Sequence, residues 1–418
     1  MLGHQKRICH GMNESDVVIV GGGPAGMMAG LLLARAGIEV LVLEKHADFF
    51  RDFRGDTVHP STMEILDQLG MLERFLERPH NRITEAQLDY NGRVLIIGDL
   101  SRLNTPAPFI AIMPQWDFLD FLRDEASVYP GFHLRMEAEV ASVIESGGRI
   151  AGIRLASGED ILARRLVIAA DGRSSFVREQ QLLPLEDLGA PIDVFWFAIP
   201  KQDQGFALRG VARAGRLMAM IDRGSYWQCA FIFAKGDAAT IMARGIAKFR
   251  ADIANCAPHV TGLEAALPDF DAVRLLSVSL DRLTCWHRPG LLAIGDAAHA
   301  MSPAGGVGIN LAIQDAVCAA NMLAAPIAKG VAVDGLLHKI QAKRMLPTRL
   351  IQSAQRAVQE RVIRPVVGSA EPRPLPAKPP WPLRLLNRYR WLRSIPGRAI
   401  GLGFRREHVQ SPQMKRAE

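Results

Sequence analysis

The sequence has few cysteines, and none of them lies in a ligand pattern. The five cysteines of the 418-residue chain are scattered, and no two have the CxxC spacing of a zinc site or a redox pair. They give no disulfide framework either, which disfavours the small secreted classes. The sequence therefore predicts no metal site and a reducing, cytoplasmic setting.

The N-terminus lacks the apolar core that a signal peptide needs. It reads MLGHQKRICHGMNESD, which carries basic residues but no run of apolar ones. We expect residues 1–15 to be an extension that precedes the first domain.

Acidic residues are outnumbered, 43 against 50 lysines and arginines, which gives a formal charge of +7. Much of the excess is arginine near the C-terminus. Such a balance can attract nucleic acid, anionic lipid or acidic ligands, but an unevenly charged solvated surface explains it as well. We expect no nucleic-acid partner.

One stretch is long and apolar enough to cross a membrane but is interrupted by glycines. Residues 17–45 read VVIVGGGPAGMMAGLLLARAGIEVLVLEK. The β-branched run 17–20 predicts a strand, residues 27–36 favour a helix, and 39–43 predict a second strand. The pattern strand, glycine turn, helix, strand is typical of a nucleotide-binding unit rather than of a membrane span.

The glycine turn has the GxGxxG spacing, and an acid, Glu44, follows the first glycine by 23 positions. Gly21 permits the tight turn, Gly23 lets the backbone approach a pyrophosphate, and Gly26 lets the helix pack closely on the strand. The N-terminus of the helix then presents free N–H groups to the phosphates. We expect Glu44 to accept hydrogen bonds from an adenosine ribose.

Two distant stretches repeat the arrangement of an acid after a strand. RRLVIAADGRSSFVR places Asp171 and Gly172 after a strand at 166–170, and GLLAIGDAAHAMSPAGGVGINLAIQDA places Asp296 after a strand at 291–294. A glycine-rich turn then opens a helix near Val307. Ligands of parallel sheets bind at the carboxyl ends of the strands, and a helix N-terminus suits an anionic ring system.

In this order the three motifs resemble those of the FAD-dependent class A aromatic hydroxylases, the family of p-hydroxybenzoate hydroxylase and the ubiquinone-biosynthesis hydroxylases. The resemblance covers roughly residues 16–320. It implies an α/β fold in which a Rossmann-like FAD-binding domain of the glutathione-reductase type is interleaved with a β-sheet substrate domain and followed by a helical C-terminal tail. The implied FAD-binding domain comprises residues 16–80, 105–180 and 281–330, the substrate domain comprises 81–104 and 181–280, and the basic, proline-interrupted tail comprises 331–418.

The resemblance also implies roles for individual residues. Asp171 would organise FAD and the path of the nicotinamide, Asp296 would bind the ribityl or phosphate side, and Pro303 would lie against the isoalloxazine. The amides from Gly306 to Asn310 would face the pyrimidine edge of the flavin. Arg54 and Gln115 would reach the pyrophosphate, and Val140 would give a backbone contact to adenine. The full set of expected cofactor residues is Gly21, Gly23, Pro24, Ala25, Gly26, Glu44, Lys45, Arg54, Gln115, Val140, Asp171, Gly172, Asp296, Pro303, Gly306, Val307, Gly308, Ile309 and Asn310.

The activity implied is that of a monooxygenase with non-covalently bound FAD. NADH or NADPH would reduce the flavin, O2 would form a C4a-hydroperoxyflavin, and its distal oxygen would pass to an electron-rich aromatic or quinone-like substrate. No catalytic base can be named, although His59 and His299 lie near the motifs, where loop histidines are more often structural. The chain is expected to be a monomer or a dimer.

Three alternatives stay open. A prenyl-chain reductase of the same superfamily would keep the FAD motifs without oxygen transfer. A flavin-dependent halogenase is less well supported, because VFWFAIP has one tryptophan, Trp196, of the two in the halogenase motif, and no lysine occurs between Lys45 and Lys201. A flavoprotein scaffold without catalysis would not need Glu44, Asp171 and Asp296 together.

Between the second and third motifs the apolar residues alternate. In GRLMAMIDRGSYWQCAFIFAKG, two expected strands flank a hairpin turn at 223–225. The alternating side chains could line a substrate pocket or form plain sheet core. They are Met218, Met220, Trp227, Phe231 and Phe233.

The tail has its own pattern. Residues 331–364 are expected to be helical, with a polar face that carries Lys343, Arg344, Arg349, Arg356 and Arg361. A proline-rich connector leads to WPLRLLNRYRWLRSIPGRAIGLGFRREHV, in which aromatic and aliphatic residues alternate with arginine. Such a segment could pack as a terminal helix on the FAD domain with its arginines in water, sit on an anionic membrane surface, or grip the entry of an apolar substrate. On a membrane the protein would be peripheral at the inner surface.

Overall fold

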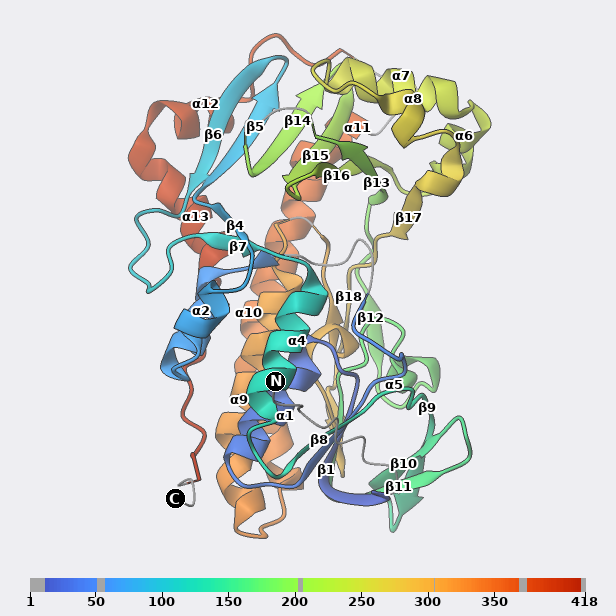
Figure 1. Ribbon diagram of the computed structural model, residues 1–418, viewed down its shortest axis with the longest axis vertical. Coiled ribbons are helices and arrows are strands. Elements are labelled where there is room, and N and C mark those ends of the chain that lie inside the picture. The colour runs from blue at the N-terminus through green and yellow to red at the C-terminus, as the bar shows by residue number, and fades with distance from the viewer. Residues whose placement is uncertain (1–11, 51–56, 202–205, 304, 368–373, 415–418) are drawn as a thin grey trace, which may run out of the picture.

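The computed structural model describes residues 12–50, 57–201, 206–303, 305–367 and 374–414. Figure 1 shows two sheets, one in each half of an elongated molecule, with one long helical stretch, residues 337–367, running from the first half to the second. The α/β class expected from the motifs is confirmed.

The first sheet contains the three motifs. Its central strands run parallel in the order β20-β11-β1-β2-β8, with β19 antiparallel at the edge and the β9–β10 hairpin extending from β11. β2 and β20 are buried throughout, and β1 and β11 are buried in their C-terminal halves, which is usual for the centre of a parallel sheet covered on both faces. Their bounds are β1 Glu14–Val20, β2 Val40–Leu43, β8 Phe132–Arg135, β9 Val140–Ser146, β10 Arg149–Leu155, β11 Asp160–Ala169, β19 His287–Arg288 and β20 Leu291–Ala293.

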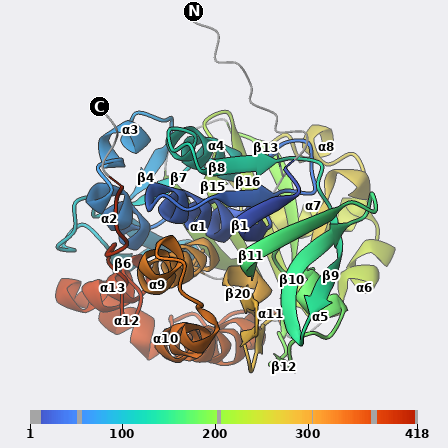
Figure 2. The same ribbon diagram turned by 90° about the horizontal axis from the view of Figure 1, so that it is seen from below.

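Apolar helices cover one face of this sheet. α1 (Pro24–Arg35) packs between α4 (Gln115–Ala126) and α9 (Gly308–Ala328), an arrangement that Figure 2 shows end-on. α9 is long and apolar enough to cross a membrane, but most of it is buried inside the protein against α1 and α10 (Leu337–Val358). α9 is therefore the central core helix of this half.

The second sheet, called the roof sheet below, lies at one end of the first half. Its strand order is β17-β13-β16-β15-β14-β5-β6, so that residues 85–99 join residues 192–277 in one sheet. β15 and β16 are antiparallel and meet at the expected hairpin turn. The bounds are β5 Glu85–Tyr90, β6 Arg93–Asp99, β13 Ile192–Pro200, β14 Leu208–Arg213, β15 Arg216–Asp222, β16 Tyr226–Ala234 and β17 Arg274–Ser277.

One face of the roof sheet packs against three short helices, α6 (Ala238–Ala243), α7 (Ile246–Cys256) and α8 (Leu263–Ala266). Phe249 of α7 contacts three aromatic rings of the sheet at ring-centroid distances of 5.2–5.7 Å. The opposite face packs against Ile363 and Val367 at the end of the α10 helical stretch. Both faces of this sheet are thus apolar.

Small elements connect the two halves. Two three-stranded sheets lie between them, β3-β7-β4 and β12-β18-β21. The remaining elements are β3 Thr57–Val58, α2 Pro60–Gln68, α3 Leu72–Leu76, β4 Asn81–Ile83, β7 Ile110–Ile112, α5 Phe176–Glu179, β12 Leu185–Asp187, η1 Phe270–Ala272, β18 Asp281–Leu283, η2 Gly295–Ala297, β21 His299–Ala300, η3 Asp334–Leu336, η4 Gln359–Ile363 (a π-helical turn), α11 Arg364–Val367, α12 Trp381–Arg388, η5 Arg390–Arg393 and α13 Ser394–Gly401.

Candidate functional site

The glycine turn follows β1 and leads directly into α1. Gly21 has φ +107°, and a Cβ there would lie 2.5 Å from the carbonyl oxygen of Ala170. A Cβ at Gly26 would lie 1.9 Å from the carbonyl oxygen of Gly21. These two glycines are therefore required by the packing of the protein itself.

Gly23 is different, because a Cβ there would have the oxygen of Ala170, 4.0 Å away, as its nearest protein neighbour. Its φ of −74° is also open to any residue. The packing of the chain therefore gives no reason for a glycine at this position. The space beside it, at the N-terminus of α1, fits the backbone approach of a pyrophosphate.

Glu44 lies beside this turn. Its Oε2 accepts a hydrogen bond from the backbone N–H of Gly22 (3.0 Å), and its Oε1 accepts one from the N–H of His46 (3.1 Å). The carboxylate at the end of β2 is thus held next to the glycine turn at the end of β1. Lys45, the next residue, is exposed. The ribose role of Glu44 remains a prediction.

Asp171 follows β11, and its backbone touches the same turn, since a Cβ on Gly21 would come within 2.6 Å of its Cα. Its Oδ2 accepts a hydrogen bond from the N–H of Phe176 (2.9 Å), whereas the buried Oδ1 has no partner in the described part of the chain. Burial raises the pKa of the Asp171 carboxyl to about 6, against hydrogen bonds from Ser175 and Phe176 that lower it. A buried carboxylate oxygen without a partner is costly unless a ligand satisfies it.

Asp296 lies in η2, just after β20. Its Oδ2 accepts a hydrogen bond from Arg173 Nε (3.2 Å), and Arg173 also donates to the carbonyl of Met301 (2.8 Å). Arg178 donates to the carbonyls of Asp296 and Ala297 and forms a buried ion pair with Asp281 (2.8 Å). Sequence reasoning missed both arginines, although they stand in the same DGRSSFVR stretch as Asp171.

The glycine-rich loop before α9 is held by the segment after Arg54. Thr57 Oγ1 donates a hydrogen bond to the carbonyl of Gly306 (3.1 Å). A Cβ on Gly306 would lie 2.3 Å from Thr57 Oγ1. Asn310 Oδ1 accepts hydrogen bonds from the N–H of His59 (2.9 Å) and from Thr62 Oγ1 (2.7 Å). Pro303, Val307, Gly308 and Ile309 are half-buried along this loop and at the start of α9.

His59 is fully buried behind the loop. Its Nδ1 donates to the carbonyl of Ile400 in α13 (2.8 Å), because a carbonyl can only accept. Burial lowers the pKa of the imidazole to about 4, so the ring is neutral at pH 7. Its Nε2, which has no partner among the described residues, would lie 3.4 Å from a Cβ on Gly306.

The other expected residues are spread more widely. Gln115 is the first residue of α4, and Val140 is the first residue of β9; both are half-buried. Arg54 lies outside the described residues. Pro24, Ala25 and Gly172 belong to the two turns described above, with φ +84° at Gly172. The roles given to these residues remain predictions.

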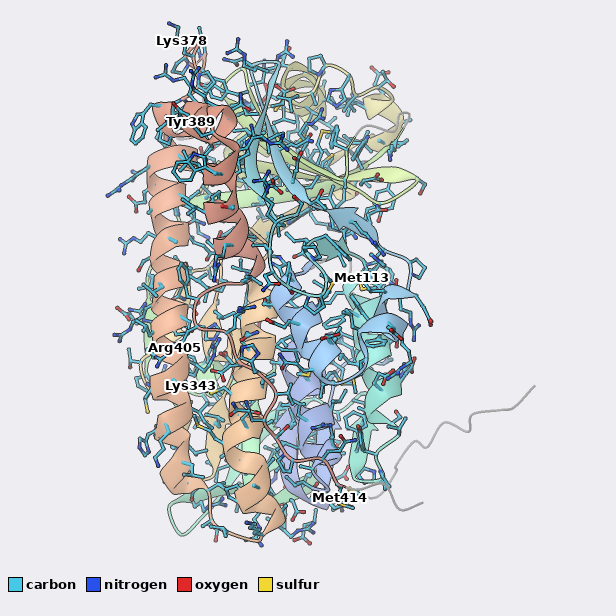
Figure 3. The ribbon with its side chains drawn as sticks, turned by 90° about the vertical axis from the view of Figure 1, so that its left-hand side faces the viewer. Met113, Lys343, Lys378, Tyr389, Arg405 and Met414 are labelled. Carbon is cyan, nitrogen blue, oxygen red and sulfur yellow. The ribbon has the colours of Figure 1, made fainter. Side chains whose placement is uncertain are left out.

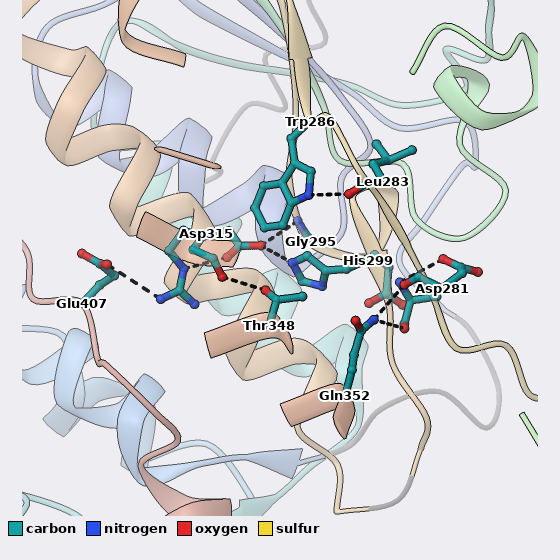
Figure 4. A network of polar contacts seen from close by, with 12 residues as sticks. Asp281, Leu283, Trp286, Gly295, His299, Asp315, Thr348, Gln352 and Glu407 are labelled. Carbon is teal, nitrogen blue, oxygen red and sulfur yellow. Dashed lines mark hydrogen bonds and ion pairs between the residues drawn. The ribbon is translucent and has the colours of Figure 1, made fainter. Parts of the chain in front are cut away.

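Below the α9 N-terminus lies a buried charged network, shown in Figure 4. Asp315 of α9 accepts hydrogen bonds from Arg344 Nε (2.8 Å) and from the N–H of Gly295 (3.1 Å), and it pairs with His299 Nε2 at 2.6 Å. Glu407 of the C-terminal segment lies 3.7 Å from Arg344. Burial alone would raise the pKa of Asp315, but the charges of His299 and Arg344 hold it below its ordinary value.

This network corrects one expectation about the tail. Arg344 does not belong to a polar face; its side chain is 1% exposed and pairs with Asp315, which is completely buried. The opposite charge 29 positions earlier on α9 makes this burial tolerable.

The alternating side chains of the second sheet had two open interpretations, a substrate pocket or plain sheet core. The alternating side chains of β15 and β16 are at most 5% exposed and pack against α7, on the sheet face covered by α6–α8. Of the two interpretations of the alternation, the structure therefore supports plain sheet core for all five: Met218, Met220, Trp227, Phe231 and Phe233. The opposite face carries Trp196, Ala219 and Ala230.

Comparison with known proteins agrees with this geometry. Residues 14–354 match the family model described as an FAD-binding domain. The chain is 31% identical to a 6-methylpretetramide 4-monooxygenase of Streptomyces rimosus over 82% of its own length and 83% of the relative. It is 31% identical to a rifampicin monooxygenase of Streptomyces venezuelae, over 79% of this chain and 68% of that one. The structure of p-nitrophenol 4-monooxygenase PnpA from Pseudomonas putida has the same fold, with a TM-score of 0.73, 19% identity, and coverage of 94% of this chain and 100% of that one.

Proposed function

The chain belongs to the FAD-binding-domain family of flavin monooxygenases, and from this premise we propose that it uses NADH or NADPH and O2 to hydroxylate an electron-rich aromatic molecule. The relatives named above act, by their names, on a pretetramide, on rifampicin and on p-nitrophenol. Their common feature is a phenolic or polycyclic aromatic framework. These relatives also favour oxygen transfer over the prenyl-reductase alternative.

The observation that carries the proposal is the unsatisfied cradle at the carboxyl ends of β1 and β11. There Asp171 Oδ1 has no partner among the described residues, and a Cβ on Gly23, the N-cap of α1, would meet its nearest described neighbour at 4.0 Å. A dinucleotide would satisfy both features, which is why the described residues fit FAD. When bound there, FAD would supply the electron transfer from the nicotinamide and the activation of O2.

The residues of the chain would then act by binding and by electrostatics. The α1 N-terminus and Gly23 would bind the pyrophosphate, and Glu44 would accept from the ribose. The α9 N-terminus, steadied by Asn310 and Thr57, would place its positive dipole end where negative charge develops. The roof sheet would keep bulk water away from the reacting atoms.

The test uses purified protein loaded with FAD, a panel of phenols and polycyclic aromatic polyketides, and one polyprenyl compound. NADH or NADPH oxidation is followed with each compound under oxygen-18 gas, and products are analysed by mass spectrometry. We expect at least one compound to accelerate oxidation and to gain one oxygen-18 atom. Reduction of a prenyl double bond without label incorporation would contradict the proposal and support a reductase.

A further inference from the structure

We propose that the segment from α12 to α13 docks the protein onto an anionic lipid bilayer. The docking surface consists of five exposed apolar side chains and four exposed arginines on α12, η5 and α13. They are Trp381, Leu385, Tyr389, Trp391 and Ile395, together with Arg384, Arg388, Arg390 and Arg398. Figure 3 shows this segment on one side of the molecule, with Tyr389 labelled.

The apolar side chains are exposed to a degree that packing does not explain. Trp381 is 66% exposed, Trp391 64% and Ile395 60%. Large apolar side chains gathered on a surface mark an interaction site, whereas scattered ones are ordinary.

The fold does not need these side chains, because the segment is anchored by its other face. Leu383 packs against the buried cluster of the roof sheet that contains Tyr90 and Leu95, and both α12 and α13 contact β6. α13 approaches β6 so closely that a Cβ on Gly397 would lie 2.2 Å from the carbonyl oxygen of Asp99. The docking surface is therefore a supported platform with its aromatic side turned outward.

The positive charge of the segment favours an anionic lipid surface as its partner. Residues 372–406 contain nine arginines and lysines and no aspartate or glutamate. Arginine beside tryptophan and tyrosine suits the headgroup region, where the rings sit at the interface and the cations meet anionic lipid. A second copy of the same surface would meet like charge, and a nucleic acid would gain little from Leu385 and Ile395.

The outward side of α10 extends this character along the same side of the molecule (Figure 3). Four aliphatic side chains on α10 and the following η4 are 42–49% exposed: Leu346, Leu350, Val358 and Val362. Exposed arginines flank them: Arg349, Arg356, Arg361 and Arg364. The lipid contact area is thus larger than the C-terminal helices alone.

The experiment is vesicle sedimentation of the full-length protein at low salt. Vesicles of phosphatidylcholine alone are compared with vesicles that also contain phosphatidylglycerol. Two variants test the surface, Trp381→Ala/Trp391→Ala and Arg384→Gln/Arg388→Gln. The matched control, Lys248→Gln/Arg274→Gln, removes two exposed cations from α7 and β17, which lie on the far side of the roof in Figure 1. Thermal unfolding of every variant checks that the fold is kept.

We expect binding to the anionic vesicles only, with release by salt. Each arginine near an anionic surface contributes roughly a fivefold gain in partitioning, so Arg384→Gln/Arg388→Gln should bind about 25-fold more weakly. The tryptophan variant should also lose binding, and the control should not. No binding of folded wild-type protein to anionic vesicles, or equal binding of all variants, would overturn the proposal. So would self-association of the wild type that the tryptophan variant abolishes, since a second copy would then be the occupant. None of these results depends on the proposed enzymatic function.

Discussion

Two buried carboxylates, Asp171 and Asp315, lie in the same half of the molecule and have opposite surroundings. Asp315 pairs with His299 and Arg344 and accepts the N–H of Gly295; burial would raise the pKa of Asp315, but its interactions with His299 and Arg344 hold that pKa below its ordinary value. Asp171 has one oxygen without a partner in the described structure, and burial raises its pKa. The comparison separates a carboxylate whose two oxygens are both paired within the chain from one whose Oδ1 has no partner among the described residues, where a ligand can bind.

Breaking the Asp315 network should give the largest change in the free energy of unfolding. Arg344→Met or Asp315→Asn leaves a buried charge without its partner, which should lower the free energy of unfolding by about 3–5 kcal/mol. Urea unfolding of the FAD-free protein measures this change. Arg78→Ala, which removes a partly exposed ion pair with Asp124, is the control and should cost less than about 1 kcal/mol.

The double variant Asp315→Asn/Arg344→Met sharpens the test. Because it removes both charges, it should recover part of the lost stability rather than add the two losses. Strict additivity of the two single changes would mean that the pair is not the source of the effect.

Removing the charge of Asp171 should raise the stability of the FAD-free protein, whereas breaking the Asp315 network should lower it. With its pKa raised to about 6, the Asp171 carboxyl favours the folded state when protonated. Its contribution is full below the ordinary pKa near 4 and is lost as the pH rises through about 6. Asp171→Asn should therefore stabilise the FAD-free protein at pH 7 by about 2–3 kcal/mol, with little difference near pH 4.

The check is urea unfolding of FAD-free wild type and variant from pH 4 to pH 8, together with FAD titration. We expect the more stable Asp171→Asn protein to bind FAD more weakly. A variant that is less stable at pH 7 than the wild type would show that Asp171 is structural, as Asp315 is.

Changing the Arg173–Asp296 ion pair should have the smallest effect on stability and on FAD binding. Arg173 and Asp296 form an ion pair in which each side chain is about a third exposed, at 33% and 32%. Arg173→Gln should change the free energy of unfolding by less than about 1 kcal/mol and the FAD dissociation constant by less than about fivefold. Fluorescence titration that gives a larger loss of affinity would place Arg173 among the groups that hold the cofactor.

The same contrast explains what the sequence could reveal. The glycine turn, Glu44 and the acids after β11 and β20 were predictable because each depends on a local strand-turn-helix rule. Arg344 was misassigned because helical periodicity alone places any arginine on the polar face. Its partner, Asp315, comes from another helix, which periodicity within one helix does not show. His59 was noticed because it lies near a motif, but its burial and its contact were not predictable, since the carbonyl of Ile400 that orients it lies 341 positions away.

The roof sheet illustrates a second limit. Alternation identified β15 and β16 as strands, but it could not tell which face meets α7. Both faces are apolar, with Phe195 and Phe197 on one and Trp196 on the other. A period of two assigns side chains to faces without naming what covers each face.

The most direct test of the cradle is the FAD dissociation constant of Gly23→Ala, measured beside the stability of the FAD-free protein. Alanine at this position meets no protein atom closer than 4.0 Å, whereas alanine at Gly26 would collide with the Gly21 carbonyl at 1.9 Å. We predict that Gly23→Ala weakens FAD binding at least about tenfold and changes the free energy of unfolding by less than about 0.5 kcal/mol. Gly26→Ala should weaken FAD binding and also lower the free energy of unfolding. Unchanged FAD affinity in a folded Gly23→Ala protein would contradict the account.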